Sequence, residues 1–95
     1  MVENTHQERR QVFYQGAVQG VGFRITTFRV AGAFDVTGFV RNLADGRVQI
    51  TCEGEVAELD AFLAGIARRM AANIQSVEMA REEARGEFEE FEIRG

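Results

Sequence analysis

The sequence contains no proline and no tryptophan, and it has one cysteine and one histidine among its 95 residues. A single cysteine excludes a disulfide within the chain and a zinc site built from a Cys/His cluster. No apolar run approaches the roughly 18 residues of a membrane-spanning helix. The polar start "MVENTHQERR" lacks the apolar segment of a signal peptide. We therefore expect a cytoplasmic protein with no membrane partner and no metal or other cofactor.

Positive charge is also scarce, since 11 basic residues face 15 acidic ones and the formal net charge is −4. A protein that binds nucleic acid without sequence preference needs a surplus of positive charge. We therefore expect no nucleic-acid partner. A small anionic ligand is compatible with this composition if positive charge is concentrated at one place.

The hydrophobic pattern predicts two helices separated by short strands. Strand-like alternation is present at 11–19, 35–42, 47–53, 74–82 and 87–94, and helical spacing at 23–34 and 56–70. Asp-Gly at 45–46 indicates a tight turn between two of the strands. In the strand at 47–53, Cys52 falls on the apolar side, which favours a buried structural thiol over a catalytic one.

This order of elements predicts an α+β fold of the ferredoxin-like, split βαβ type, βαββαβ with a short fifth strand. Two helices should pack on one face of a mixed, mostly antiparallel sheet. We expect residues 1–9 to form a disordered tail and residues 10–95 to form a single domain, present as a monomer.

One loop stands out in this arrangement. The stretch "GAVQGVGFR", residues 16–24, places three glycines and an arginine where the first strand passes into the first helix. Glycines allow the backbone N–H groups of such a turn to point inward, and a helix start adds unpaired donors, so the loop favours an anion. Arg24 is electrostatically unfavourable at the positive end of a helix, and an external anion at the same place would explain it. A tight turn with a solvent-facing arginine is the simpler alternative.

Topology brings a second polar residue to this loop. In a right-handed βαβ unit the first and second strands run parallel, so their carboxyl ends lie at the same edge of the sheet. Arg24 follows the first strand and Asn42 ends the second. We therefore expect the two side chains to lie close together, at an edge where ligands commonly bind.

The segments "GAVQGVGFR" and "GFVRNLADGRVQ" resemble the signature motifs of the acylphosphatase family. The resemblance covers residues 12–94, and it implies the ferredoxin-like fold and metal-free hydrolysis of an acyl phosphate to a carboxylate and inorganic phosphate. It also implies that Arg24 binds the phosphoryl group and that Asn42 orients the attacking water. The remaining phosphate contacts fall on the backbone of the loop: Gln19, Gly20, Val21, Gly22 and Phe23.

The resemblance leaves two functions open. The first is an acylphosphatase, with a small-molecule acyl phosphate as substrate and inorganic phosphate as product and inhibitor. The second is a catalytically weak module that binds anions or acyl phosphates on the same fold. Two departures from the family pattern motivate this alternative: Phe39 replaces the usual tryptophan, and Asp35 replaces a glycine near the end of the first helix.

Overall fold

The computed structural model describes residues 6–95, which form two helices and five strands. The elements follow one another as β1 (Gln7–Gly16), α1 (Phe23–Ala31), β2 (Val36–Asn42), β3 (Val48–Glu55), α2 (Val56–Met70), β4 (Ile74–Glu83) and β5 (Phe91–Arg94). This is the βαββαβ order with a short fifth strand that the hydrophobic pattern predicts.

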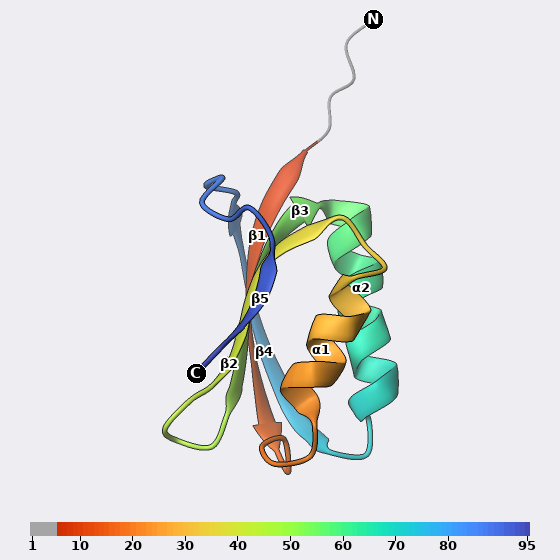
Figure 1. Cartoon of the computed structure of the whole chain (residues 1–95), viewed down its shortest axis with the longest axis vertical. Coiled ribbons are helices and arrows are strands. Elements are labelled where there is room, and N and C mark those ends of the chain that lie inside the picture. Colours follow the sequence, from red (N-terminus) through yellow and green to blue (C-terminus); the bar gives the residue numbers. More distant parts are fainter. Residues whose placement is uncertain (1–5) are drawn as a thin grey trace, which may run out of the picture.

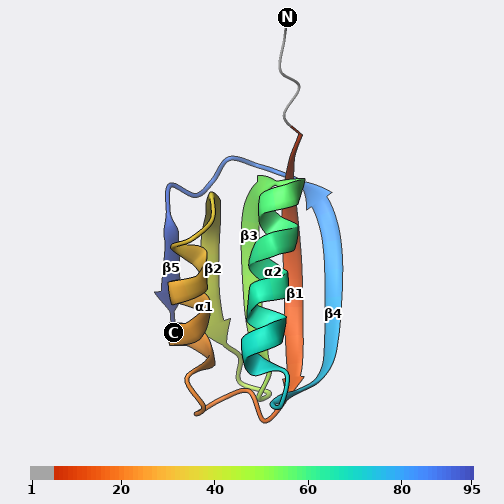
Figure 2. The same cartoon turned by 90° about the vertical axis from the view of Figure 1, so that its right-hand side faces the viewer.

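The strands form one mixed sheet in the order β4-β1-β3-β2-β5, with β2 and β5 parallel and the other neighbours antiparallel. Both helices lie on the same face of the sheet (Figure 1), where α2 covers β1 and β3 while α1 lies near β2 and β5 (Figure 2). Because β1 and β2 are both antiparallel to β3, they run parallel to each other and end at the same edge. The ferredoxin-like prediction is confirmed.

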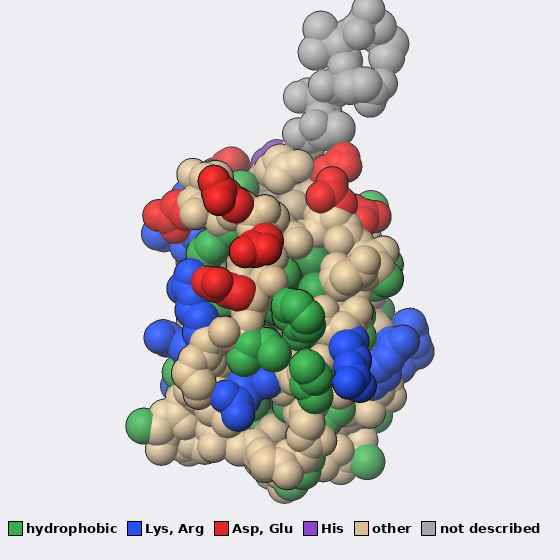
Figure 3. All heavy atoms as spheres, viewed as in Figure 1, with side chains coloured by type: hydrophobic (Ala, Val, Ile, Leu, Met, Phe, Trp, Pro, Cys, Tyr) green, Lys and Arg blue, Asp and Glu red, His purple; other side chains and the backbone are tan. Residues whose placement is uncertain are grey.

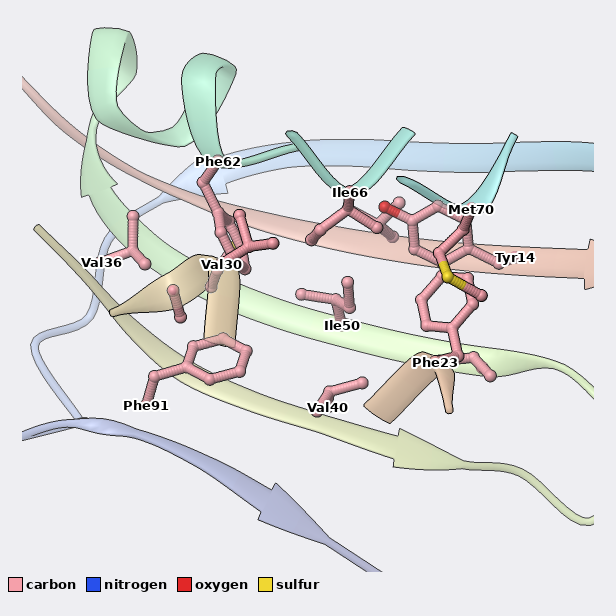
Figure 4. Close-up of a cluster of buried hydrophobic side chains, with 14 of the residues drawn as sticks. Tyr14, Phe23, Val30, Val36, Val40, Ile50, Phe62, Ile66, Met70 and Phe91 are labelled. Carbon is pink, nitrogen blue, oxygen red and sulfur yellow. The ribbon is translucent and has the colours of Figure 1, made fainter. Parts of the chain in front are cut away.

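The core lies between the helices and the sheet. The stripe on α2 supplies Leu59, Phe62, Ile66 and Met70, all buried, as helical spacing predicts. Figure 4 shows Phe62, Ile66 and Met70 meeting side chains of α1 and the strands. The ring centroids of Phe62 and Phe91 are 5.4 Å apart. This packing holds α1 against the sheet and thereby sets the direction in which its first turn points.

Three expected boundaries were wrong. Strand β1 begins at Gln7, so residues 7–9 belong to the sheet and not to a tail; residues 1–5 lie outside the described residues. Arg9 is 4% exposed there and pairs with Glu53, which explains why a polar segment is ordered. Helix α1 ends at Ala31, earlier than expected, and β5 begins only at Phe91.

On the face of the sheet away from the helices, a network of charged side chains is partly buried. The Glu53 carboxylate accepts hydrogen bonds from Arg9 Nε at 2.8 Å and from the backbone N–H groups of Arg85 and Gly86, both at 2.9 Å. Arg9 also pairs with Glu87. Glu53 therefore ties the segment that leads from β4 to β5 onto the back of β3.

Replacing Glu53 with glutamine should lower the free energy of unfolding at pH 7 by about 2–3 kcal/mol, because Arg9 loses its buried partner. Burial raises the pKa of Glu53, but the hydrogen bonds from Arg85, Arg9 and Gly86 outweigh it and hold the pKa below the ordinary 4.5. The carboxylate's contribution is thus complete above about pH 4.5 and is lost as the pH falls through the lowered value. Urea unfolding of wild type, Glu53→Gln and the exposed control Glu83→Gln should show the smallest acid sensitivity for Glu53→Gln. Equal losses on acidification in all three proteins would contradict this role.

Candidate functional site

The loop between β1 and α1 requires glycine for its backbone geometry. Gly20 and Gly22 have φ angles of 77° and 81°, and Gly22 is the N-cap of α1 in the left-handed conformation. A Cβ atom at Gly20 would meet nothing within 4 Å, so the positive φ angle and not crowding favours glycine there. This curled backbone ends at the unpaired N–H groups of the helix start, which is the arrangement that binds anions.

The side chain of Gln19 fastens this loop to the connection between β2 and β3. Its Nε2 donates hydrogen bonds to the carbonyl oxygens of Leu43 at 2.8 Å and Arg47 at 3.0 Å. Leu43 directly follows Asn42 at the end of β2. The glycine loop and Asn42 are therefore held in a common frame by one side chain.

A cavity of about 290 Å³ opens between this loop, α1 and the sheet edge. Eight residues of the described chain line it: Val18, Gly20, Gly22, Phe23, Arg24, Ile25, Asn42 and Ile93. Arg24 and Asn42 are thus brought together as topology predicts, from segments separated in the sequence.

Arg24 lies in the first turn of α1, which contains no acidic residue. Its side chain is half-buried, and Nη1 donates a hydrogen bond of 2.8 Å to the main-chain oxygen of Gly95. The guanidinium has five N–H donors, so this contact orients the group and leaves further donors for a ligand. The guanidinium charge and the positive helix end together give the cavity a positive potential, although the whole chain is acidic.

Asn42 ends β2 at the wall of the cavity. Its Oδ1 atom is buried and has no hydrogen-bond partner among the described residues. An unpaired buried acceptor costs about 1–3 kcal/mol, so a fold retains one where the atom has a use. Asn42 as a whole is only partly buried where it lines the cavity, so its amide could hydrogen-bond a water molecule there.

Two of the residues predicted for phosphate binding do not line the cavity. Gln19 is occupied by its contacts to Leu43 and Arg47, and Val21 is exposed on the outer side of the loop. Their backbone N–H groups remain candidates, but their side chains lie outside the cavity. Conversely, Ile25 and Ile93 line it and had not been expected there. The only signal for Ile25 was that it widened the apolar stripe of α1 beyond one helix face.

Other reactive side chains lie apart from this cavity. His6 is exposed at the start of β1, at the end of the sheet remote from the glycine loop (Figure 1). Cys52 is buried within β3, where burial raises the pKa of its thiol to about 12. Within residues 6–95, no three His, Cys, Asp or Glu side chains are grouped so that they could hold a metal ion. Neither helix of the described part has the length and apolar character needed to cross a membrane.

Comparison with known proteins gives consistent matches over nearly the whole chain. The family model described as Acylphosphatase matches residues 10–93. A protein from Geobacter sulfurreducens named acylphosphatase is 42% identical over 90 residues, covering 90% of this chain and 96% of that protein. One of the same name from Archaeoglobus fulgidus is 40% identical over 84 residues, covering 87% and 93%. The crystal structure of acylphosphatase from Bacillus subtilis superposes with a TM-score of 0.83 at 25% identity, covering 93% of this chain and 99% of that one.

Proposed function

The chain belongs to the acylphosphatase family, and we propose that its cavity at the start of α1 is the place where an acyl phosphate is hydrolysed. The protein is a hydrolase that converts an acyl phosphate to a carboxylate and inorganic phosphate. One observation supports this location above the others: Arg24, the glycine loop and Asn42, whose Oδ1 is unpartnered among the described residues, line the same cavity.

The phosphoryl group binds to the loop and to Arg24. Backbone N–H groups from Gln19 to Phe23 point at its oxygens, and the guanidinium forms a two-pronged contact with two of them. Both kinds of donor are fixed before the substrate arrives, so they stabilise developing charge without reorganisation. In a loose transition state, this positioning and charge stabilisation supply most of the catalysis.

Asn42 holds the attacking water. The new bond forms between the water oxygen and phosphorus, and the bond between phosphorus and the acyl oxygen breaks, with its electron pair leaving on the carboxylate. A carboxylate is a good leaving group, so the reaction needs neither a strong general base nor a covalent enzyme intermediate. The protons of the water pass to phosphate and solvent.

Hydrolysis of acetyl phosphate with and without EDTA tests this function. We expect turnover that EDTA does not reduce, with inorganic phosphate as a competitive inhibitor. If acetyl phosphate binds but is not hydrolysed, the protein is a binding module. If EDTA abolishes turnover, the site depends on a metal and the mechanism above is wrong.

The two departures from the family pattern lie away from the cavity, which disfavours a weak binding module. The ring of Phe39 packs edge-on against Phe88, with centroids 5.9 Å apart, and the Arg94 guanidinium lies 4.3 Å from its centroid. These contacts are on the back face of the sheet. Asp35 does not adopt a positive φ angle, and its backbone N–H donates to the Glu58 carboxylate at 2.7 Å. Neither substitution alters the cavity wall.

We further propose that the protein works as a monomer in the cytoplasm, without membrane or nucleic-acid partners. The single, buried Cys52 supports the cytoplasmic location, and the net charge of −4 supports the absence of a nucleic-acid partner. Light scattering coupled to size-exclusion chromatography should give a mass near 10.6 kDa. A dimeric mass would contradict the proposed monomer.

Cys52 should take no part in catalysis. Cys52→Ala should leave turnover within a few-fold of wild type while lowering the free energy of unfolding by about 1 kcal/mol, because a buried sulfur atom is lost. Iodoacetamide should react slowly with the native protein, since burial raises the pKa of the thiol to about 12, and rapidly after denaturation. Fast alkylation of the native protein in step with loss of activity would show that the thiol is functional.

A further inference from the structure

Three large apolar side chains are exposed together beside the cavity. Ile25 and Phe28 on α1 are 43% and 44% exposed, and Ile93 on β5 is 39% exposed. Figure 3 shows hydrophobic side chains gathered over α1 and β5 in the middle of this face. We call Ile25, Phe28 and Ile93 the apolar platform. Exposing such side chains costs stability, so a cluster of them next to a site indicates a binding surface.

The platform is continuous with the cavity. Ile25 and Ile93 line the same cavity as Arg24 and Asn42. Phe28 follows Ile25 by three positions and therefore lies on the same side of the helix. A ligand whose phosphoryl group is held at Arg24 thus has an apolar surface beginning next to it and extending away along α1 and β5.

Charge at the far end of the platform restricts what can lie on it. Phe28 lines a shallow groove whose charged residues are three acids, Asp35, Glu89 and Glu90, and one cation, Arg29, so acidic side chains outnumber the arginine there. Acidic side chains lie above the hydrophobic ones in Figure 3, at the end remote from the glycine loop. A ligand with a second negative charge at its far end would meet apolar side chains first and carboxylates next, and both disfavour it.

We infer that the substrate carries an apolar acyl group, aliphatic or aromatic, which packs on Ile25, Phe28 and Ile93. This inference rests on the proposed function, because the platform can contact the acyl group only if the phosphoryl group is held at Arg24. The platform makes the enzyme selective for uncharged acyl chains of several carbons over acyl groups that end in a carboxylate.

The test is a series of acyl phosphates of increasing length, from acetyl to hexanoyl phosphate. In the wild type, kcat/KM should rise about twofold to fourfold for each added methylene, the upper value corresponding to full burial. Butyryl phosphate should exceed succinyl phosphate, which has a similar length and a terminal carboxylate, by about tenfold or more.

The double variant Ile25→Thr/Ile93→Thr should flatten this dependence on length. Threonine keeps the β-branched shape but replaces apolar surface with a hydroxyl, so the advantage of hexanoyl over acetyl phosphate should fall by at least about fivefold. The matched control is Val77→Thr/Met79→Thr, because both residues are 50% exposed on β4, at the opposite edge of the sheet. The control should retain the wild-type dependence.

Failure of the inference is distinguishable from failure of the proposed function. If wild type hydrolyses acetyl phosphate but shows no dependence on chain length, or if the double variant keeps the dependence, the platform is not an acyl site. If no acyl phosphate is hydrolysed, the proposed function is wrong and the inference falls with it. Inhibition of the wild type by methyl-, butyl- and hexylphosphonate needs no variant: affinity should rise along this series, and equal affinities would overturn the inference.

Discussion

Replacing Arg24 with alanine should reduce kcat for acetyl phosphate by about 100- to 1,000-fold and weaken inhibition by inorganic phosphate. Among residues 6–95, Arg24 is the one side-chain cation that lines the cavity, and losing one preorganised donor typically costs that much in rate. The affinity for inorganic phosphate should fall as well, because bound phosphate carries negative charge that the Arg24 guanidinium would stabilise.

A second variant at Arg24 separates the effect of its charge from that of its geometry, and a variant at Arg29 serves as the control. Arg24→Lys should restore little activity, since an ammonium group cannot reproduce a planar two-pronged contact. Arg29→Ala is the matched control, because Arg29 lies on the same helix and lines a groove facing α2 instead of the cavity. It should behave as wild type. An Arg24→Ala protein with half its activity and normal phosphate affinity would show that the phosphoryl group binds elsewhere.

Replacing Asn42 with alanine should lower kcat by about 100-fold while phosphate binds with nearly wild-type affinity. The expected loss is selective because, in the proposed mechanism, the amide contacts the water and not the phosphoryl group. An interaction made only in the transition state affects kcat and kcat/KM equally. Steady-state hydrolysis and phosphate inhibition, measured on the same protein, separate the two quantities.

Asn42→Asp should be equally slow and should also weaken phosphate binding, since a carboxylate at the cavity wall repels the bound anion. Thermal unfolding of both variants controls for damage to β2. If Asn42→Ala keeps the wild-type kcat, the amide does not hold the water. Arg24 would then bind the phosphoryl group, and a residue other than Asn42 would hold the water.

The sequence was most informative where periodicity and backbone chemistry agree. Helical spacing predicted one apolar stripe on α2, and four of its six residues, Leu59, Phe62, Ile66 and Met70, are buried, while Val56 and Leu63 are partly buried. The fold class followed from the order of the elements. The meeting of Arg24 and Asn42 at one edge followed from the parallel direction of β1 and β2.

Buried charge was the main feature that the pattern did not predict. Arg9 is 4% exposed and Arg10 2% exposed, yet the polar composition of residues 1–9 predicted a disordered tail that ended at Arg9. Arg9 is paired with Glu53, and Arg10 with Asp60 at 2.6 Å, on opposite faces of the sheet. These partners lie more than 40 positions away in the chain, so local composition carries no sign of them.

The same limit applies to the site. The glycines and Arg24 predict an anion site from the sequence alone, because backbone conformation and charge are local properties. The contacts of Gln19 to Leu43 and Arg47, and the approach of Ile93 to Ile25, depend on how β5 and the β2–β3 connection return to the loop. Such contacts exist only after the chain has folded, so the apolar platform could not be inferred from spacing alone.

The location of the phosphate site is the central claim, and backbone amide chemical shifts measured during titration with inorganic phosphate test it most directly. The largest changes should fall on Gly20, Gly22 and Phe23 and on the Asn42 side-chain amide, with saturation that matches the inhibition constant. The molecule offers a clear alternative in the groove between the helices, where Arg29, Arg68 and Arg69 lie together. Changes concentrated at those three arginines, with none in the glycine loop, would contradict the account.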